Sequence, residues 1–304
     1  MTDNYKFDGT HETKMYGDNI RVRSRIQNLH KVEKYFIEQC EKLNIEFSYD
    51  CQASERVNWS TLNYTNYCGM MFISPLCHET SLVQLYDAAL DNMNDIGHIN
   101  FIKNNIKNNI ANKYLLNTDR DDKEFKKYDG KRADYVCVLP GHNKFHHVNG
   151  RKIKTIANHF RSNLIFKLHP ITTDEILRDS GFHSIVERYN CQVAGQDIHL
   201  YDLIEKSKGI YSTYASETAL TALICGKTVE PIDNYDNINN NGFSPISHFC
   251  YNYKDAVEKL SKIFASHKSG IIHPDIDKDW KDKVNNYLKY ILEKRELQNG
   301  FFLQ

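Results

Sequence analysis

The chain has 304 residues, which is enough for two domains of ordinary size or one large one. Lysine plus arginine and aspartate plus glutamate both number 39, so no net charge attracts the protein to nucleic acid or to an anionic membrane. No run of about 18 apolar residues argues for a membrane-spanning helix, and the polar N-terminal stretch lacks the apolar segment of a signal peptide. We therefore expect a cytoplasmic protein.

Helix and strand patterns in the first part of the chain follow an irregular lead-in over residues 1–22. Apolar residues at helical spacing predict an amphipathic helix over 24–43. The apolar run 68–74 predicts a buried strand that ends at Pro75, and the polar stretch 117–132 has the composition of a linker. The other elements expected here are a strand over 45–49 and helices over 78–92 and 100–116.

From residue 134 onward, short apolar strands alternate with helical patterns. This alternation with short loops is typical of a parallel, doubly wound sheet. We expect a threonine N-cap at Thr172 or Thr173, a C-cap at Gly226, and a loop over 233–245. The expected strands cover 134–139, 164–168, 192–194, 209–212 and 228–232, and the expected helices cover 150–160, 172–179, 199–206, 216–225, 253–265 and 280–297.

Two strand–turn–helix units carry polar residues at the predicted carboxyl edge of this sheet. Open α/β sheets bind ligands at that edge, where helix N-termini offer N–H groups to phosphate. A nucleoside phosphate is therefore the expected ligand. Helix capping and a structural histidine beside a turn are the alternative readings of these residues. The first unit supplies Lys167 and His169, and the second supplies Ser212, Thr213, Ser216 and Glu217.

The loop 141–147, GHNKFHH, follows the first strand of the second half and lies at the same predicted edge. His142 and Lys144, with the nearby His146, are candidates for donor contact. A solvated loop is the alternative, and a metal site is less favoured because no carboxylate lies beside these histidines.

Three residues are candidates for a general base. His78 and Glu79 follow the buried strand of the first half, at a predicted helix start. Asp129 lies in the polar stretch before the second half. An acidic residue in a first helical turn is also the ordinary partner of the helix dipole, so Glu79 has a structural alternative.

The order of these motifs resembles bacterial glycosyltransferases of the GT-B type, including the capsule-polysaccharide and Kdo transferases and several sialyltransferases. The matching residues are KLHP at 167–170, YST at 211–213 and ALICGKTV at 222–229, and the resemblance covers about residues 134–232. It implies that His169, Ser212 and Thr213 hold the phosphate and nucleotide of a donor. Two departures are the single acid in Tyr128-Asp129-Gly130, where sialyltransferases carry two, and Thr228 in place of a proline.

The resemblance implies an α/β, GT-B-like fold with two Rossmann-like domains and a donor cleft between them. We expect an acceptor-side domain over 1–130, a nucleotide-sugar domain over 131–270 and a closing helix over 271–304. The implied activity transfers sugar from a CMP- or UDP-linked donor, with no cofactor and no metal. The acceptor is a bacterial surface glycan or hydroxymethylated phage DNA, and the cytoplasm is that of a bacterial cell or a phage-infected host.

Two alternatives to sugar transfer remain open. CDP-glycerol glycerophosphotransferases share a similar KLHP, so a CDP-linked glycerophosphate or phosphosugar transferase fits the same motif. A non-catalytic nucleotide- or glycan-binding protein also fits. Product analysis separates the first from a glycosyltransferase, and donor turnover excludes the second.

Overall fold

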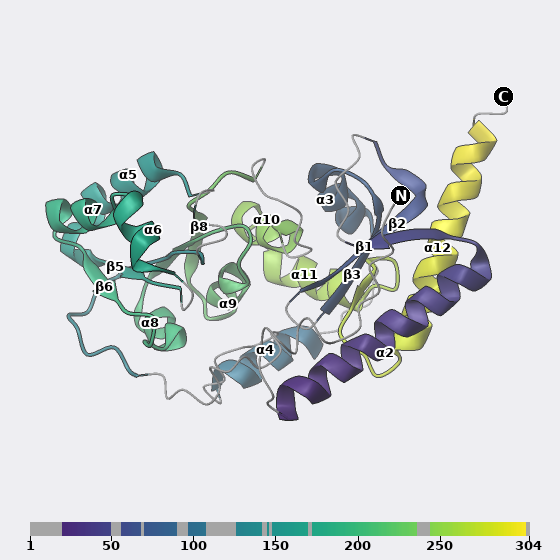
Figure 1. Ribbon diagram of the computed structural model, residues 1–304, viewed down its shortest axis with the longest axis horizontal. Helices are drawn as coiled ribbons and strands as arrows, with labels where there is room; N and C mark the ends of the chain where they lie inside the picture. The colour runs from purple at the N-terminus through teal and green to yellow at the C-terminus, as the bar shows by residue number, and fades with distance from the viewer. Residues whose placement is uncertain are drawn as a thin grey trace.

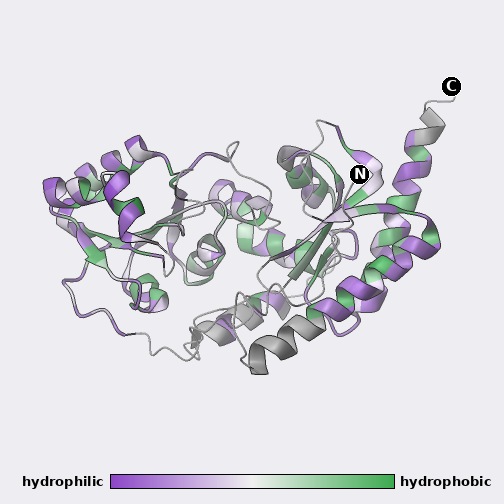
Figure 2. Ribbon diagram, viewed as in Figure 1, coloured by the Kyte–Doolittle hydropathy of each residue, from purple (hydrophilic) through white to green (hydrophobic). Residues whose placement is uncertain are grey.

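The structure is a computed structural model, and the chain is described here over residues 20–49, 56–67, 70–89, 97–107, 126–141, 145, 148–169, 172–235 and 244–301. It is a mixed α/β protein with one four-stranded and one five-stranded sheet (Figure 1). Hydrophobic stretches follow the strands of both sheets, and hydrophilic stretches mark the outer helices (Figure 2). Within these ranges, no helix combines the length and the apolar character needed to cross a membrane.

The four-stranded sheet is mostly antiparallel. β1 runs parallel to β2, whereas β2 and β3, and β3 and β9, pair antiparallel. Only two residues separate β2 from β3, and so short a connection joins strands in the antiparallel sense. This sheet therefore does not have the parallel order expected of a Rossmann-like domain. Its strands, in spatial order, are β1 (Glu46–Tyr49), β2 (Asn58–Tyr67), β3 (Met70–Leu76) and β9 (Ile271–Ile272).

Strand β3 continues through Pro75, so the prediction that it ends there is wrong. Pro75 lies opposite Leu62, beside a register shift in β2 between Asn58 and Leu62. Proline lacks the N–H that a regular ladder uses, and an irregular partner strand removes that requirement. β2 is absent from the predicted elements because most of its residues are Asn, Thr or Ser, although Leu62 and Tyr64 alternate on a buried face.

Helices cover both faces of this sheet. Met70 and Phe72 belong to one hydrophobic cluster, whereas Met71 and Ile73 belong to another. This alternation follows from the strand period of two. The first cluster includes α3 (Glu79–Ala88), α4 (Gly97–Lys107), α9 (Thr218–Ile224), α10 (Ser244–Asn252) and α11 (Ala256–Ala265), and the second includes α2 (Ile20–Leu43) and α12 (Trp280–Phe301).

The five-stranded sheet is parallel throughout, which confirms the predicted α/β pattern of the second half. Its spatial order is β6-β5-β4-β7-β8. The strands lie within one or two residues of the predicted bounds. They are β4 (Tyr135–Val138), β5 (Leu164–Lys167), β6 (Gln192–Ala194), β7 (Gly209–Ser212) and β8 (Thr228–Pro231).

Alternate residues of the parallel strands again separate two layers. Cys137 and Phe166 belong to the cluster that includes α5 and α7. Val136, Ile165 and Ile210 belong to the cluster that includes α8. The sheet is therefore covered on both faces, as a doubly wound sheet requires. The helices of this half are α5 (Gly150–Phe160), α6 (Asp174–Asp179), α7 (Phe182–Tyr189) and α8 (Leu200–Lys206), with a short 3₁₀ turn η2 (Arg161–Asn163) after α5.

Several helix ends follow the expected capping chemistry. The Thr173 side chain accepts a hydrogen bond from Ile176 N and caps α6. Gly226 follows the C-cap of α9 with φ 72°, a left-handed conformation that glycine adopts without strain. Helices α7 and α10 are absent from the predicted elements, and α10 begins at Ser244, inside the segment expected to be a loop.

Helices α9 and α10 contact elements of both halves. α9 packs on β7 and β8, and α10 packs on α9, β8 and α3. Because β9 and α12 belong with the four-stranded sheet, the chain returns to its first sheet after completing its second. The domain boundaries at 130 and 270 stay predictions.

Candidate functional site

The strand order of the parallel sheet creates a switch point between β4 and β7. The chain leaves β4 toward β5 and β6 on one side, then returns to β7 and β8 on the other. The two central strands are therefore followed by connections to opposite sides of the sheet, and ligands of open α/β sheets bind at the carboxyl edge of such a switch point. Residues 139–149 follow β4, and residues 213–217, which we name the Ser/Thr loop, follow β7.

Helix α10 holds the Ser/Thr loop in place. The Ser247 hydroxyl donates to the Ser216 carbonyl at 3.0 Å, and the Tyr251 hydroxyl donates to the Thr213 carbonyl at 3.2 Å. Within the loop, the Ser216 hydroxyl donates to Thr218 Oγ1 at 2.8 Å and accepts from Thr218 N at 3.2 Å. The loop is therefore a fixed structure in which the Ser216 hydroxyl accepts from the N–H of Thr218, the first residue of α9.

The structure brings together all four residues predicted in this unit. Ser212 and Thr213 are buried, and Ser216 and Glu217 are half-buried. The Glu217 carbonyl accepts from the N–H and the hydroxyl of Thr221, at 3.1 and 3.2 Å. The hydroxyl and carboxyl groups thus gather at the end of β7, while their role toward a donor stays a prediction.

Asp233 lies beside this loop and is missing from the predicted site residues. It follows β8 and is only 3% exposed, and its two carboxylate oxygens accept the Tyr214 N–H at 3.1 and 3.3 Å. Burial raises the pKa of Asp233 to about 6, against the opposing effects of the Tyr214 N–H and the Lys152 charge. Its position after a predicted parallel strand was the available signal, but its burial is a property of the tertiary structure.

Aromatic side chains surround the same loop. The ring of Tyr214 lies 5.1 Å from Tyr235 and 4.9 Å from Tyr251, between ring centroids, and Tyr235 lies 4.6 Å from His248. Burial lowers the pKa of His248 and raises that of Tyr251 well above its usual value. These ring contacts surround the side chain of Tyr214, whose backbone N–H donates to Asp233.

The turn that carries His169 is tied to the loop after β4. Leu139 N donates to the Lys167 carbonyl at 3.0 Å, and Thr172 Oγ1 donates to the Pro140 carbonyl at 3.3 Å. Thr172 N closes the turn by donating to the His169 carbonyl at 2.9 Å. Half-buried His169 therefore lies at the carboxyl edge, on the strand next to the switch point.

The Lys167 side chain is committed to backbone carbonyls. Its ammonium donates to Leu168 O at 2.6 Å, Gly195 O at 2.9 Å and Gln196 O at 3.3 Å, and the residue is 3% exposed. An ammonium has three hydrogens, so these bonds use its donor capacity. Lys167 joins the ends of β5 and β6, and its predicted contact with a donor is not tested by this geometry.

The candidate bases lie on different elements. The exposed His78 side chain accepts from Thr80 N at 3.4 Å and caps α3, of which Glu79 is the first residue. Exposed Asp129 adjoins Tyr128, whose hydroxyl donates to Gln192 on the edge strand β6. The structure therefore does not bring Asp129 to the β4–β7 switch point, and all three catalytic roles stay predictions. His142, Lys144 and His146 lie outside the described residues.

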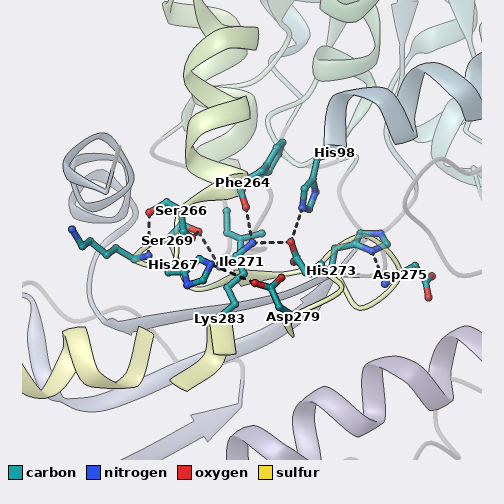
Figure 3. A network of polar contacts seen from close by, with 12 residues as sticks. His98, Phe264, Ser266, His267, Ser269, Ile271, His273, Asp275, Asp279 and Lys283 are labelled. Atoms are coloured by element: carbon teal, nitrogen blue, oxygen red, sulfur yellow. Dashed lines mark hydrogen bonds and ion pairs between the residues drawn. The ribbon is translucent and has the colours of Figure 1, made fainter. Parts of the chain in front are cut away.

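A second polar cluster, missed by sequence reasoning, lies between α4, α11 and α12 (Figure 3). The Asp277 carboxylate lies 3.1 Å from Lys283 Nζ and 3.4 Å from His98 Nε2, and it accepts from His273 N at 2.7 Å. Lys283 Nζ also donates to the Phe264 carbonyl at 2.5 Å. All four ionisable side chains are buried.

The charges in this cluster compensate one another. Burial alone would raise the pKa of Asp277, but the Lys283 charge and the His98 contact hold it well below its usual range. His98 also stacks on Phe264 at 4.8 Å between centroids. The cluster therefore joins α4, α11 and α12 through the 273–279 segment, which is a structural role.

Within the described ranges, no three His, Cys, Asp or Glu side chains come close enough together to hold a metal ion. No protein-family model and no curated protein matches the sequence. Among solved structures, a crystal structure of a glycosyltransferase from Rickettsia africae ESF-5 is similar at 13% identity and a TM-score of 0.27, over 91% of this chain and 82% of that chain. A TM-score this low carries no argument about this protein.

Proposed function

We propose that this chain is a glycosyltransferase that uses a nucleotide-linked sugar. One observation carries the proposal: the switch point of a parallel sheet receives a hydroxyl-rich loop that neighbouring elements hold rigidly. Such an edge suits a nucleoside phosphate, because fixed hydroxyl and N–H groups bind phosphate oxygens without further ordering. The proposed donor is a CMP- or UDP-linked sugar, bound by the parallel sheet as the nucleotide-binding half of a GT-B-like arrangement, from which the mostly antiparallel first sheet departs.

The residues near the switch point are proposed to have separate roles in such a reaction. Ser212, Thr213 and Ser216 are proposed to hold the donor, and Glu217 to accept from a ribose hydroxyl. His169 is proposed to stabilise the departing nucleotide phosphate as its charge develops. Deprotonation of the acceptor hydroxyl is proposed to fall to His78 or Glu79. Transfer is proposed to need no metal, with a surface glycan or hydroxymethylated DNA as acceptor.

The first test is a thermal shift with CMP, CDP, UMP, UDP, GDP and ADP. A ligand that binds only the folded state raises the unfolding midpoint, and we expect one cytidine or uridine nucleotide to do so. The matching sugar donor is then incubated with and without EDTA, and release of nucleotide and of intact sugar is measured. Release of CMP with transfer of a glycerophosphate identifies the CDP-linked alternative instead.

The matched variants are His169→Ala and His159→Ala. His159 is an exposed histidine in the last turn of α5, near the opposite edge of the sheet. We expect His169→Ala to lower donor turnover at least tenfold at an unchanged unfolding midpoint, and His159→Ala to have no effect. No midpoint shift with any nucleotide, or equal turnover in both variants, contradicts the proposal.

A further inference from the structure

Asp233 is a buried carboxylate without an ion-pair partner among the described residues. It lies on the segment that leaves β8, and it accepts hydrogen bonds from the backbone N–H of Tyr214 and from its own backbone N–H. An aspartate in an apolar environment prefers its neutral form, and burial accordingly raises the pKa of Asp233 to about 6. At neutral pH the fold nevertheless holds this side chain as a carboxylate.

The charged and titratable groups that face Asp233 come from three elements. Lys152, in the first turn of α5, contributes a favourable charge, and Tyr251 of α10 feels the carboxylate as an unfavourable one. Tyr214, in the Ser/Thr loop, supplies the hydrogen bond. None of these contacts compensates the charge of Asp233 as a close ion pair would. The charged form of Asp233 therefore does not stabilise the fold.

The Tyr214 N–H is the point at which β8 fixes the Ser/Thr loop. Helix α10 holds the same loop through the carbonyls of Thr213 and Ser216, on either side of Tyr214. Without an acceptor at position 233, the central peptide of the loop loses its fixed orientation. A carboxylate is the strongest acceptor that a side chain offers to an N–H group.

We propose that Asp233 is a positioning residue that holds the Ser/Thr loop in the shape that receives the phosphate groups of a nucleotide-linked donor. This inference rests on the proposed function. Asp233 is proposed to act through Tyr214, because its carboxylate accepts the backbone N–H of that residue. It therefore deepens the site by adding a residue that the hydroxyl motif alone does not reveal.

The test compares Asp233→Leu, which removes the acceptor and keeps the branching at Cγ, with Asp233→Asn, which keeps an accepting oxygen. Asp233→Ala is a second acceptor-free variant in case the leucine variant does not fold. Glu230→Gln is the matched control, because it removes an exposed carboxylate from β8 itself. Hydrogen–deuterium exchange of peptides containing Tyr214 is measured without ligand, and peptides from α7 serve as the internal reference.

The same variants are titrated with UDP-glucose and with CMP-N-acetylneuraminic acid at neutral pH. We expect the acceptor-free variants to exchange at least tenfold faster at Tyr214 and to bind the preferred donor at least tenfold more weakly, with an unfolding midpoint near the wild-type value. Asp233→Asn should restore both exchange and affinity to within about threefold. A merely structural carboxylate would not give this rescue together with an affinity loss at constant midpoint.

Each other outcome has a definite meaning. Unchanged exchange at Tyr214 in both acceptor-free variants overturns the positioning role, whatever the affinity. Faster exchange with unchanged donor affinity also overturns it, because the loop would then not act in binding. Absence of nucleotide binding by the wild-type protein refutes the proposed function, while the exchange result still decides whether Asp233 fixes the loop.

Discussion

Replacing Asp233 by asparagine should stabilise the protein, and the gain should grow with pH. The pKa of Asp233 is about 6 in the folded state against an ordinary value of 3.8, so the folded state binds the proton more tightly than the unfolded chain. The contribution of Asp233 to stability is then greatest at low pH. It falls as the pH rises from about 4, where the carboxyl ionises in the unfolded chain, to about 6, where it ionises in the folded protein. Between about pH 5 and pH 7.5 this linkage lowers the free energy of unfolding of the wild-type protein by about 1.4 kcal/mol.

Asparagine does not titrate, so Asp233→Asn escapes this loss while its side-chain oxygen still accepts from Tyr214 N. For a chain of 304 residues, 1.4 kcal/mol corresponds to about 2 °C in the unfolding midpoint. Scanning fluorimetry and urea unfolding at about pH 5, 6 and 7.5 measure the difference between the two proteins, with Glu230→Gln as the exposed-carboxylate control. A difference that stays constant with pH, or that shrinks as pH rises, refutes the reasoning.

Three further predictions concern the rest of the fold. Lys283→Met leaves the Asp277 carboxylate buried without its cation and should lower the free energy of unfolding by about 3–5 kcal/mol in urea, whereas Lys289→Met at an exposed position of the same helix should change it by less than about 0.5 kcal/mol. The pKa of Asp277 is lowered in the folded state, so its contribution to the free energy of unfolding is present above the unfolded pKa of about 4 and is lost as the pH falls further. Acid titration followed by circular dichroism should show an unfolding step that Asp277→Asn shifts. Gly270→Ala should destabilise by about 2 kcal/mol or more in thermal unfolding, because Gly270 has φ 70° and an added Cβ would meet the Ile73 carbonyl.

The sequence was most informative where local pattern and tertiary structure agree. The three central strands of the parallel sheet, β4, β5 and β7, are short apolar runs between turn signals, and buried parallel strands have that composition. The hydroxyl-rich end of β7 was therefore identified from sequence together with its place at the sheet edge. The loop between Ser212 and Thr218 has the contacts of a fixed structure, as a binding loop requires.

Elements and residues defined by distant contacts were not predictable. β9 has only two residues, and its pairing with β3 joins positions about two hundred residues apart, which no local pattern reveals. α10 was not predicted for two reasons. An Asn-rich stretch precedes it, and its first turn contains Pro245, a residue that interrupts a helix in its interior but is compatible with a helix start. In the sequence, Asp233 looks like an ordinary turn residue and Lys167 like a ligand contact. Only the structure shows that Asp233 is buried and that Lys167 donates to backbone carbonyls.

The return of the chain to its first sheet has a consequence for the order of synthesis. A ribosome releases β4 to β8 consecutively, so the five-stranded sheet has all its strands once Pro231 has emerged. The four-stranded sheet must wait for β9 and for the covering helix α12, which lie after residue 270. Its apolar residues Met71 and Ile73 therefore lack their contacts with β9 and α12 during most of translation, although α2, which packs on β3, has already emerged.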